Sequence, residues 1–176
     1  KRHILGALFM SPLSEREFQV PASFEEKTQR MFGFCRVCCM TENQLLLLAD
    51  GQREAAETLE GTGPVNIANE IKALEMIKTA AKTALERFST EIESDEKLLE
   101  EKKYADINER NCIVMRLGEK KVLQWFVDMA GRAQEMLQMS FYSFRSKCVQ
   151  SMYEDRAFDV YSQKVIEPLL RAERFP

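Results

Sequence analysis

The sequence is poor in glycine, proline and histidine, and it has no long apolar run. Only 7 Gly and 5 Pro occur among 176 residues, so sharp turns are few and the secondary-structure elements should be long. No apolar run approaches the roughly 20 residues that a membrane-spanning helix requires. The formal charge of −3 indicates no basic face of the kind that nucleic acids bind. We therefore expect neither a membrane nor a nucleic acid as a partner.

The chain has a single histidine, His3. A cysteine nucleophile requires a histidine base, so the sequence argues against a catalytic site of the Cys-His type. Cys35, Cys38 and Cys39 share one helical face, whereas zinc ligands usually come as separated pairs on loops. We predict no metal site and no catalytic residue, and we assign these three cysteines to the core. Five cysteines, an odd number, do not suggest a secreted disulfide framework, so we expect an intracellular, reducing compartment.

Helical periodicity dominates the chain. The predicted fold is therefore all-α, a multi-helix bundle with long antiparallel helices and at most one short extended segment, Glu17 to Val20. The predicted helices cover residues 1–10, about 24–39, 45–48, 52–59, 67–88, 92–99, about 109–137 and 141–174. The last of these should be interrupted near residues 153–155. The second of these should bury Phe24, Met31, Phe34, Cys35, Cys38 and Cys39.

Short polar residues mark the points where these helices should begin. The predicted caps are the boxes Ser23 with Glu26 and Thr41 with Gln44, then Asn66, the pair Ser89-Thr90, and Asp106 or Asn108. Gly118 and Gly131 fall inside the longest helix, where each costs about 1 kcal/mol relative to alanine. We therefore expect both glycines at close helix contacts. Pro168 should kink or restart the last helix.

Four motifs rich in charged residues follow one another along the chain. They are Arg36-Val37-Cys38-Cys39-Met40-Thr41-Glu42, Asn69-Glu70, Thr90-Glu91-Ile92-Glu93-Ser94-Asp95-Glu96-Lys97-Leu98-Leu99, and Met115-Arg116-Leu117-Gly118-Glu119-Lys120-Lys121-Val122-Leu123. Their order and spacing, over roughly residues 15–140, resemble the C-terminal substrate-binding domain of the Rubisco large-subunit methyltransferase type of SET-domain protein. The resemblance implies a helical domain that binds a non-histone protein whose lysine, or in one branch histidine, is methylated.

The catalytic half of that family is not represented here. It uses an Asn-His pair and a glycine-rich segment for the methyl donor, and this sequence has neither. We therefore predict that residues 1–176 form a single helical domain of the substrate-binding type, with the SET domain absent from this chain. The chain begins at Lys1 without an initiator Met, so we expect it to be a piece of a longer protein. S-adenosylmethionine is expected only for a SET-containing parent, and no cofactor is expected in this chain.

Acidic residues in the third motif are the candidate substrate-binding residues. Glu91, Glu93, Asp95 and Glu96 could attract a basic segment that carries the target lysine. The alternative is that this helical run of acids is a solvated face. In the fourth motif, the pair Lys120-Lys121 is interpreted as solvated. Arg116 and Glu119 are interpreted as a surface pair with a structural role, because they lie three residues apart.

Two hypotheses of different classes follow. The first is the protein-substrate recognition module of a SET-domain protein-lysine methyltransferase, whose partners are a protein substrate and the SET domain of the parent. The second is a stand-alone helical interaction or scaffold domain without enzyme activity. We expect no activity from this chain alone in either case.

Overall fold

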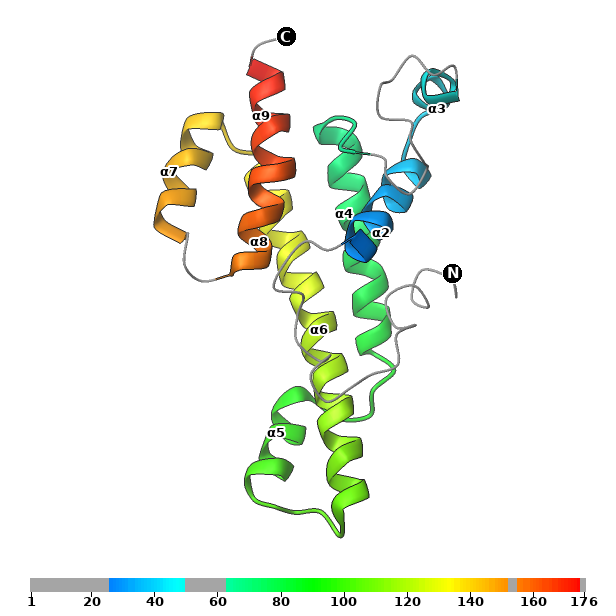
Figure 1. Ribbon diagram of the computed structural model, residues 1–176, viewed down its shortest axis with the longest axis vertical. Coiled ribbons are helices and arrows are strands. Elements are labelled where there is room, and N and C mark those ends of the chain that lie inside the picture. The colour runs from blue at the N-terminus through cyan, green and yellow to red at the C-terminus, as the bar shows by residue number, and fades with distance from the viewer. Residues whose placement is uncertain (1–25, 50–62, 152–154, 175–176) are drawn as a thin grey trace.

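Figure 1 shows the computed structural model, which describes residues 26–49, 63–151 and 155–174. All regular structure within these ranges is helical, so the predicted all-α class is confirmed. None of the described helices combines the length and the apolar composition needed to cross a membrane. The elements are α2 (Glu26–Cys38), α3 (Glu42–Ala49), α4 (Ile67–Leu85), α5 (Ile92–Glu100), α6 (Ile107–Leu137), α7 (Phe141–Ser151), α8 (Arg156–Tyr161), the π-helix η2 (Ser162–Ile166) and α9 (Glu167–Arg174).

Two predicted caps close the first turns of α3 and α4. The Thr41 amide donates to Gln44 Oε1 at 2.9 Å, and the Gln44 amide donates to Thr41 Oγ1 at 3.3 Å, which completes the capping box. Asn66 Oδ1 accepts the Asn69 amide at 2.8 Å. The expectations for residues 1–25, including the cap at Ser23, and for residues 50–62 lie outside the described residues.

The starts of α5 and α6 differ in how they are capped. Asp106 Oδ1 accepts hydrogen bonds from the amides of Asn108 and Glu109, each at 2.8 Å. Of the two predicted caps, Asp106 and Asn108, Asp106 is therefore the one that caps α6. The predicted cap at residues 89–90 is wrong, because the N-cap of α5 is Glu91 and its side chain makes no capping bond. The Thr90 hydroxyl has other partners, described below.

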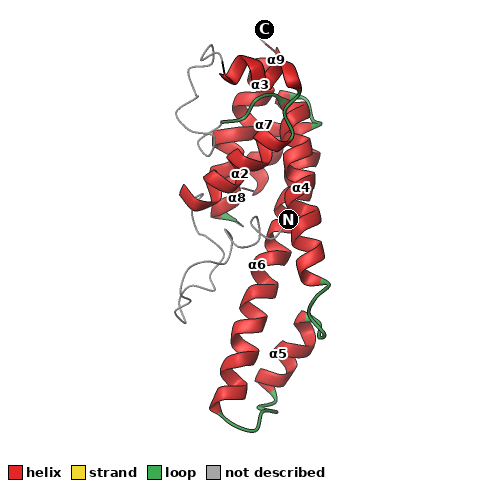
Figure 2. Ribbon diagram, turned by 90° about the vertical axis from the view of Figure 1, so that its right-hand side faces the viewer, coloured by secondary structure: helices red, strands yellow, loops and turns green. Residues whose placement is uncertain are grey.

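Helix α6 is the spine of the molecule. Its 31 residues span about 46 Å at 1.5 Å per residue. Figure 2 shows α4 and α5 following one another along this helix, with α4 on its C-terminal half and α5 on its N-terminal half. We call α5 with its N-cap Glu91, together with residues 107–121 of α6, the arm. Helices α8 and α9 lie at the opposite end of the spine (Figure 1).

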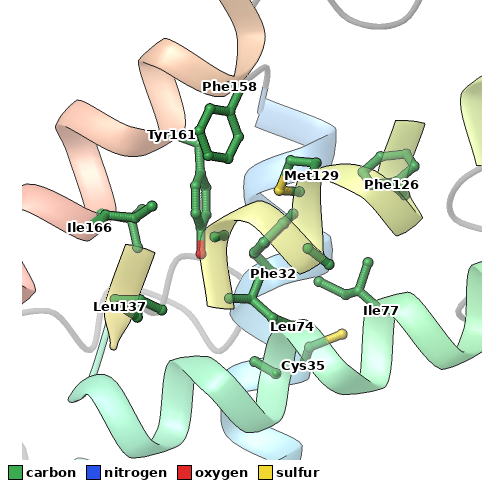
Figure 3. Close-up of a cluster of buried hydrophobic side chains, with 14 of the residues drawn as sticks. Phe32, Cys35, Leu74, Ile77, Phe126, Met129, Leu137, Phe158, Tyr161 and Ile166 are labelled. Atoms are coloured by element: carbon green, nitrogen blue, oxygen red, sulfur yellow. The ribbon is translucent and has the colours of Figure 1, made fainter. Parts of the chain in front are cut away.

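One hydrophobic core joins α2, α4, α6, α8, η2 and α9 (Figure 3). Phe32 and Tyr161 pack with ring centroids 5.3 Å apart, and both side chains are fully buried. Leu74 of α4 and Met129 of α6 are also fully buried in this cluster. Complete burial of a side chain of this size contributes about 1.5–3 kcal/mol each.

The buried face of α2 is rotated from the predicted one. Phe34 is 47% exposed and Cys38 is exposed, so both core assignments are wrong. Phe32 is buried instead, together with the correctly predicted Met31 and Cys35. At 100° per residue, Phe32 and Phe34 point in nearly opposite directions, so only one of the two can face α4 and α8.

The predicted interruption at Pro168 takes the form of a change in helix type. The Glu167 amide donates to Ser162 O, five residues back, which is the π-helical pattern. Pro168 follows in the first turn of α9, where its missing N–H leaves the carbonyl of residue 164 without a donor four residues on. Wider helical spacing just before a proline accommodates this loss.

Candidate functional site

The first two motifs meet in a buried ion cluster that we call the Glu70 cluster: Arg36, Asn69, Glu70 and Tyr161. Arg36 Nε donates to Glu70 Oε2 at 2.6 Å, and Arg36 Nη2 donates to Glu70 Oε1 at 2.8 Å. The Tyr161 hydroxyl donates to Glu70 Oε1 at 2.6 Å. Asn69 Nδ2 donates to the carbonyl oxygen of Arg36 at 3.0 Å. The cluster therefore joins α2, α4 and the end of α8.

Burial and pairing act against each other on the charges of the Glu70 cluster. Burial opposes the charge on Arg36, but the hydrogen bonds and the charge of Glu70 outweigh it and raise the pKa of Arg36. Burial, followed by the Glu70 charge, raises the pKa of Tyr161 well above its usual range. Tyr161 is therefore a permanent hydrogen-bond donor. Removing one partner from such a buried pair typically costs about 3–5 kcal/mol.

The third and fourth motifs meet in the Asp95 cluster: Thr90, Asp95, Arg116 and Lys120. Asp95 Oδ2 accepts Arg116 Nε at 2.9 Å and Lys120 Nζ at 2.6 Å, and Arg116 Nη2 binds Asp95 Oδ1. The Lys120 ammonium also donates to Thr90 Oγ1 at 2.7 Å, and the Thr90 hydroxyl donates to Asp95 Oδ1 at 3.1 Å. Asp95 is fully buried and Lys120 is 1% exposed. This cluster holds α5 against α6.

The Asp95 carboxylate is stabilised in its charged form. The Arg116 hydrogen bonds outweigh the opposing effect of burial and, with Lys120 and Thr90, lower the pKa of Asp95 to about 2. The aromatic ring of Phe88 adds to the site, because its centroid lies 5.4 Å from Lys120 Nζ. Asp95 is therefore ionised at neutral pH, and its charge is compensated inside the protein.

Two interpretations of these motifs need correction. Lys120 is not solvated, because its ammonium lies on Asp95 inside the protein, whereas Lys121 is exposed as predicted. Arg116 binds Asp95 of α5 rather than pairing along its own helix with Glu119. Its predicted structural role is nevertheless correct.

The candidate substrate-binding residues fall into two groups. Asp95 is buried within its cluster, so its carboxylate does not form part of the surface. Glu91, Glu93 and Glu96 are exposed on the arm. Glu96 Oε1 lies 2.7 Å from Lys121 Nζ, and no ion pair involves Glu91 or Glu93 among the described residues. Their role in substrate binding remains a prediction.

A third polar cluster contains residues that the sequence analysis missed. Asp155 Oδ2 accepts Trp125 Nε1 at 2.8 Å and Arg132 Nη2 at 2.6 Å, while Asp155 Oδ1 caps α8 through the Phe158 amide at 3.1 Å. Burial would raise the pKa of Asp155, but these hydrogen bonds outweigh it and lower the pKa. Asp155 could have been recognised as a cap, since it directly precedes the helical segment at Arg156. Its partners on α6, Trp125 and Arg132, have no local sequence pattern that would identify them as partners of Asp155.

The cysteines occupy different environments. Burial, with the neighbouring Cys38, raises the pKa of Cys35 to about 12, and burial also raises the pKa of Cys39. Cys38 and Cys112 are exposed. Within the described ranges, no group of three or more Cys, His, Asp or Glu side chains is arranged to hold a metal ion.

Comparison with known proteins identifies relatives of this chain. A family model described as "Rubisco LSMT substrate-binding" matches residues 1–123. A tobacco (Nicotiana tabacum) protein, the chloroplastic ribulose-1,5 bisphosphate carboxylase/oxygenase large subunit N-methyltransferase, is 38% identical over 85 residues. That alignment covers 47% of this chain and 17% of the tobacco protein. No solved structure gives a significant match. The matched region contains the whole Asp95 cluster and three of the four residues of the Glu70 cluster, while Tyr161 lies beyond it.

Proposed function

The chain belongs to the Rubisco LSMT substrate-binding family, and from this membership we propose that it is the protein-substrate recognition module of a SET-domain protein-lysine N-methyltransferase acting on a non-histone protein. Its partners are then the substrate protein and the SET domain of the parent protein. Recognition of this kind is positional: the module holds a folded substrate so that one lysine reaches the reaction centre. Such positioning contributes to the rate because the reacting groups meet already oriented.

The Asp95 cluster is the observation that most directly supports this function. It fixes α5 against α6 through two cations and a hydroxyl on one buried carboxylate. A surface that is ordered before binding loses less conformational freedom when a partner docks. The buried residues of the third and fourth motifs thus support a recognition surface and do not form that surface themselves.

The exposed acids of the arm are the proposed contact residues for the substrate. Glu91, Glu93 and Glu96 would attract a basic segment next to the target lysine, and Asp95 would hold the helix that carries them. Glu91 and Glu93 have no internal ion pair among the described residues, so a basic partner would not need to displace one.

The methyl donor would bind elsewhere in the parent protein. S-adenosylmethionine would be held by the SET domain, since this sequence has neither an Asn-His pair nor a glycine-rich donor-binding segment. The second candidate function is a helical interaction or scaffold domain without enzyme activity. It is kept because the family model that matches the chain describes substrate binding and not catalysis.

The two functions are separated by a methylation assay on the full-length gene product, with labelled S-adenosylmethionine and proteins extracted from the same organism. We expect label to enter a protein substrate. A variant with Glu91→Gln, Glu93→Gln and Glu96→Gln should raise KM for that substrate by about tenfold with kcat unchanged, because each exposed pair contributes up to about 1 kcal/mol.

The matched control for this assay neutralises three exposed acids away from the arm, Glu42, Glu86 and Glu173. It should leave KM unchanged. Absence of methyl transfer by the full-length protein would favour the scaffold function. Equal KM for both triple variants would remove the arm as the contact surface.

A further inference from the structure

A basic and aromatic patch lies where α7 meets α9, which Figure 1 shows side by side. We call it the α7–α9 patch: Phe141, Arg145, Glu167 and Arg171. The guanidinium carbons of Arg145 and Arg171 lie 6.0 Å and 5.9 Å from the centroid of the Phe141 ring. Both guanidiniums also bind Glu167 Oε1, Arg145 at 3.5 Å and Arg171 at 2.9 Å. One ring and one carboxylate oxygen therefore hold two arginines close together.

Both arginines remain available to a partner. The Arg145 side chain is 60% exposed and the Arg171 side chain is 59% exposed, whereas Glu167 is 25% exposed. Each guanidinium carries five N–H donors in a planar fork. Each uses only one nitrogen on Glu167. The patch keeps a net charge of +1 and has donors directed to solvent, so a further carboxylate can be bound by two arginines at once.

Two open hollows border α7 and α9. One, of about 610 Å³, is lined by Gln163, Glu167, Pro168, Arg171 and Ala172. The other, of about 550 Å³, is lined by Met139, Tyr142, Ser143, Ser146 and Lys147. Both lie beyond residue 123, where the match to the family model ends. The surface that surrounds the two arginines therefore belongs to the part of the chain outside that match.

We propose that the α7–α9 patch is a docking site for an acidic segment of a partner protein, with Arg145 and Arg171 binding its carboxylates. Charge complementarity supports this occupant, because planar arginine forks bind carboxylates in a paired geometry. A nucleic acid is less well matched, since it requires a wider basic surface than two arginines beside a glutamate. The proposal rests on the proposed function in one respect: the acidic segment would belong to the methylated substrate and would help to select it.

The site can be tested on the full 176-residue chain with a defined probe, a blocked peptide of six glutamates. We expect the backbone amide NMR signals of α7 and α9 to shift during titration at low salt, and a peptide of six lysines should not shift them. The variant Arg145→Gln with Arg171→Gln should weaken binding at least about fivefold, as expected for loss of two exposed charge contacts. Thermal unfolding of the variant, followed by circular dichroism, checks that the fold is retained.

A control variant replaces two exposed arginines outside the patch, Arg87→Gln and Arg156→Gln, and thus makes the same change in net charge. It should bind the glutamate peptide like the parent chain. The proposal is overturned if the peptide does not bind, if the shifted signals lie outside α7 and α9, or if both double variants lose affinity equally. Because peptide binding is read without methyl transfer, failure here leaves the methylation assay unaffected. Conversely, peptide binding at the patch without any methyl transfer would retain the docking site and reject the enzyme function.

Discussion

Tyr161 donates its phenolic hydrogen to Glu70 at 2.6 Å, across 91 positions of the sequence. Glu70 lies within the region that matches the family model, and Tyr161 lies 38 residues beyond the end of that region at residue 123. The buried ion pair between Arg36 and Glu70 is thus completed by a residue from the C-terminal part of the chain. The two parts share one core, and the C-terminal helices stabilise the motif residues.

Loss of the Tyr161 hydroxyl should destabilise the whole domain. Tyr161→Phe removes a hydrogen bond to a charged acceptor, which contributes about 1.5–3 kcal/mol, and keeps the ring that packs on Phe32. The free energy of unfolding in urea measures the loss. Tyr104→Phe is the control, because Tyr104 is only partly buried and its hydroxyl makes no hydrogen bond among the described residues. Equal stability of both variants would show that the bond to Glu70 contributes nothing.

Loss of the Asp95 charge should loosen the arm. Asp95→Asn leaves the Lys120 ammonium buried without its carboxylate, and we expect a loss of about 3 kcal/mol. Hydrogen exchange should become faster in α5 and in residues 107–121 than in α4. The control Glu96→Gln breaks an exposed pair with Lys121 and should cost less than about 1 kcal/mol. A uniform increase in exchange would mean that the arm is not a separate unit.

Acid should remove the contribution of the Asp95 cluster. The pKa of Asp95 is about 2 in the folded protein, against an ordinary value of 3.8. The unfolded chain therefore binds the proton more readily, so the contribution is complete above about pH 4 and is lost as the pH falls towards 2. The difference corresponds to about 2 kcal/mol. Unfolding free energies measured from pH 5 to pH 2 should depend less on pH in Asp95→Asn than in the parent, and identical slopes would refute the assignment.

The two glycines of α6 should respond in opposite directions to alanine. A Cβ atom at Gly131 would meet nothing within 4 Å, so the expectation of a close contact there is wrong. Gly131→Ala should raise the free energy of unfolding by about 1 kcal/mol through helix propensity. Gly118 is buried, and for Gly118→Ala we expect overpacking, which costs about 1–3 kcal/mol, to exceed that gain. Thermal melting of both variants tests the pair, and stabilisation by Gly118→Ala would show that this position is open.

Thiol reagents should distinguish the cysteines by position. Cys38 and Cys112 are exposed and should react first, whereas Cys35 is buried and its high pKa keeps it protonated. Peptide mapping after brief alkylation of the native protein identifies the modified sites. Elemental analysis of the same sample should find no stoichiometric zinc. Rapid modification of Cys35 would mean that α2 does not pack as described.

Much of the helical framework could be predicted from local signals. Asn66 and Asp106 mark the starts of their helices, and the apolar spacing predicts the extent of α6. Burial of charge was harder to foresee, although a local signal existed. Lys120 continues the buried stripe of Ile113 and Leu117, and Asp95 lies three residues after Ile92 on the inner face of α5. A charged residue inside an apolar stripe indicates a buried partner of opposite charge. Treating the acids of the third motif and the pair Lys120-Lys121 as solvated did not take this sign into account.

Long-range partnerships had no such signal. Nothing local connects Arg36 with Tyr161, since their meeting depends on how α2, α4 and α8 pack together. The sequence alone also does not decide whether Phe32 or Phe34 faces the core, because either residue fits an apolar stripe along α2. Tertiary packing decides such questions, and periodicity along one helix does not contain that information.

The continuity of α6 also fixes the distance between two surface regions of the molecule. Its 31 residues contain no proline and run unbroken from the arm to the turn before α7. Glu96 pairs with Lys121, and Leu137 at the end of α6 lies 16 residues further along that helix, which corresponds to about 24 Å. A partner that touches both the arm and the α7–α9 patch must therefore present its own basic and acidic regions at a matching spacing, so substrate choice would depend on distance as well as on charge.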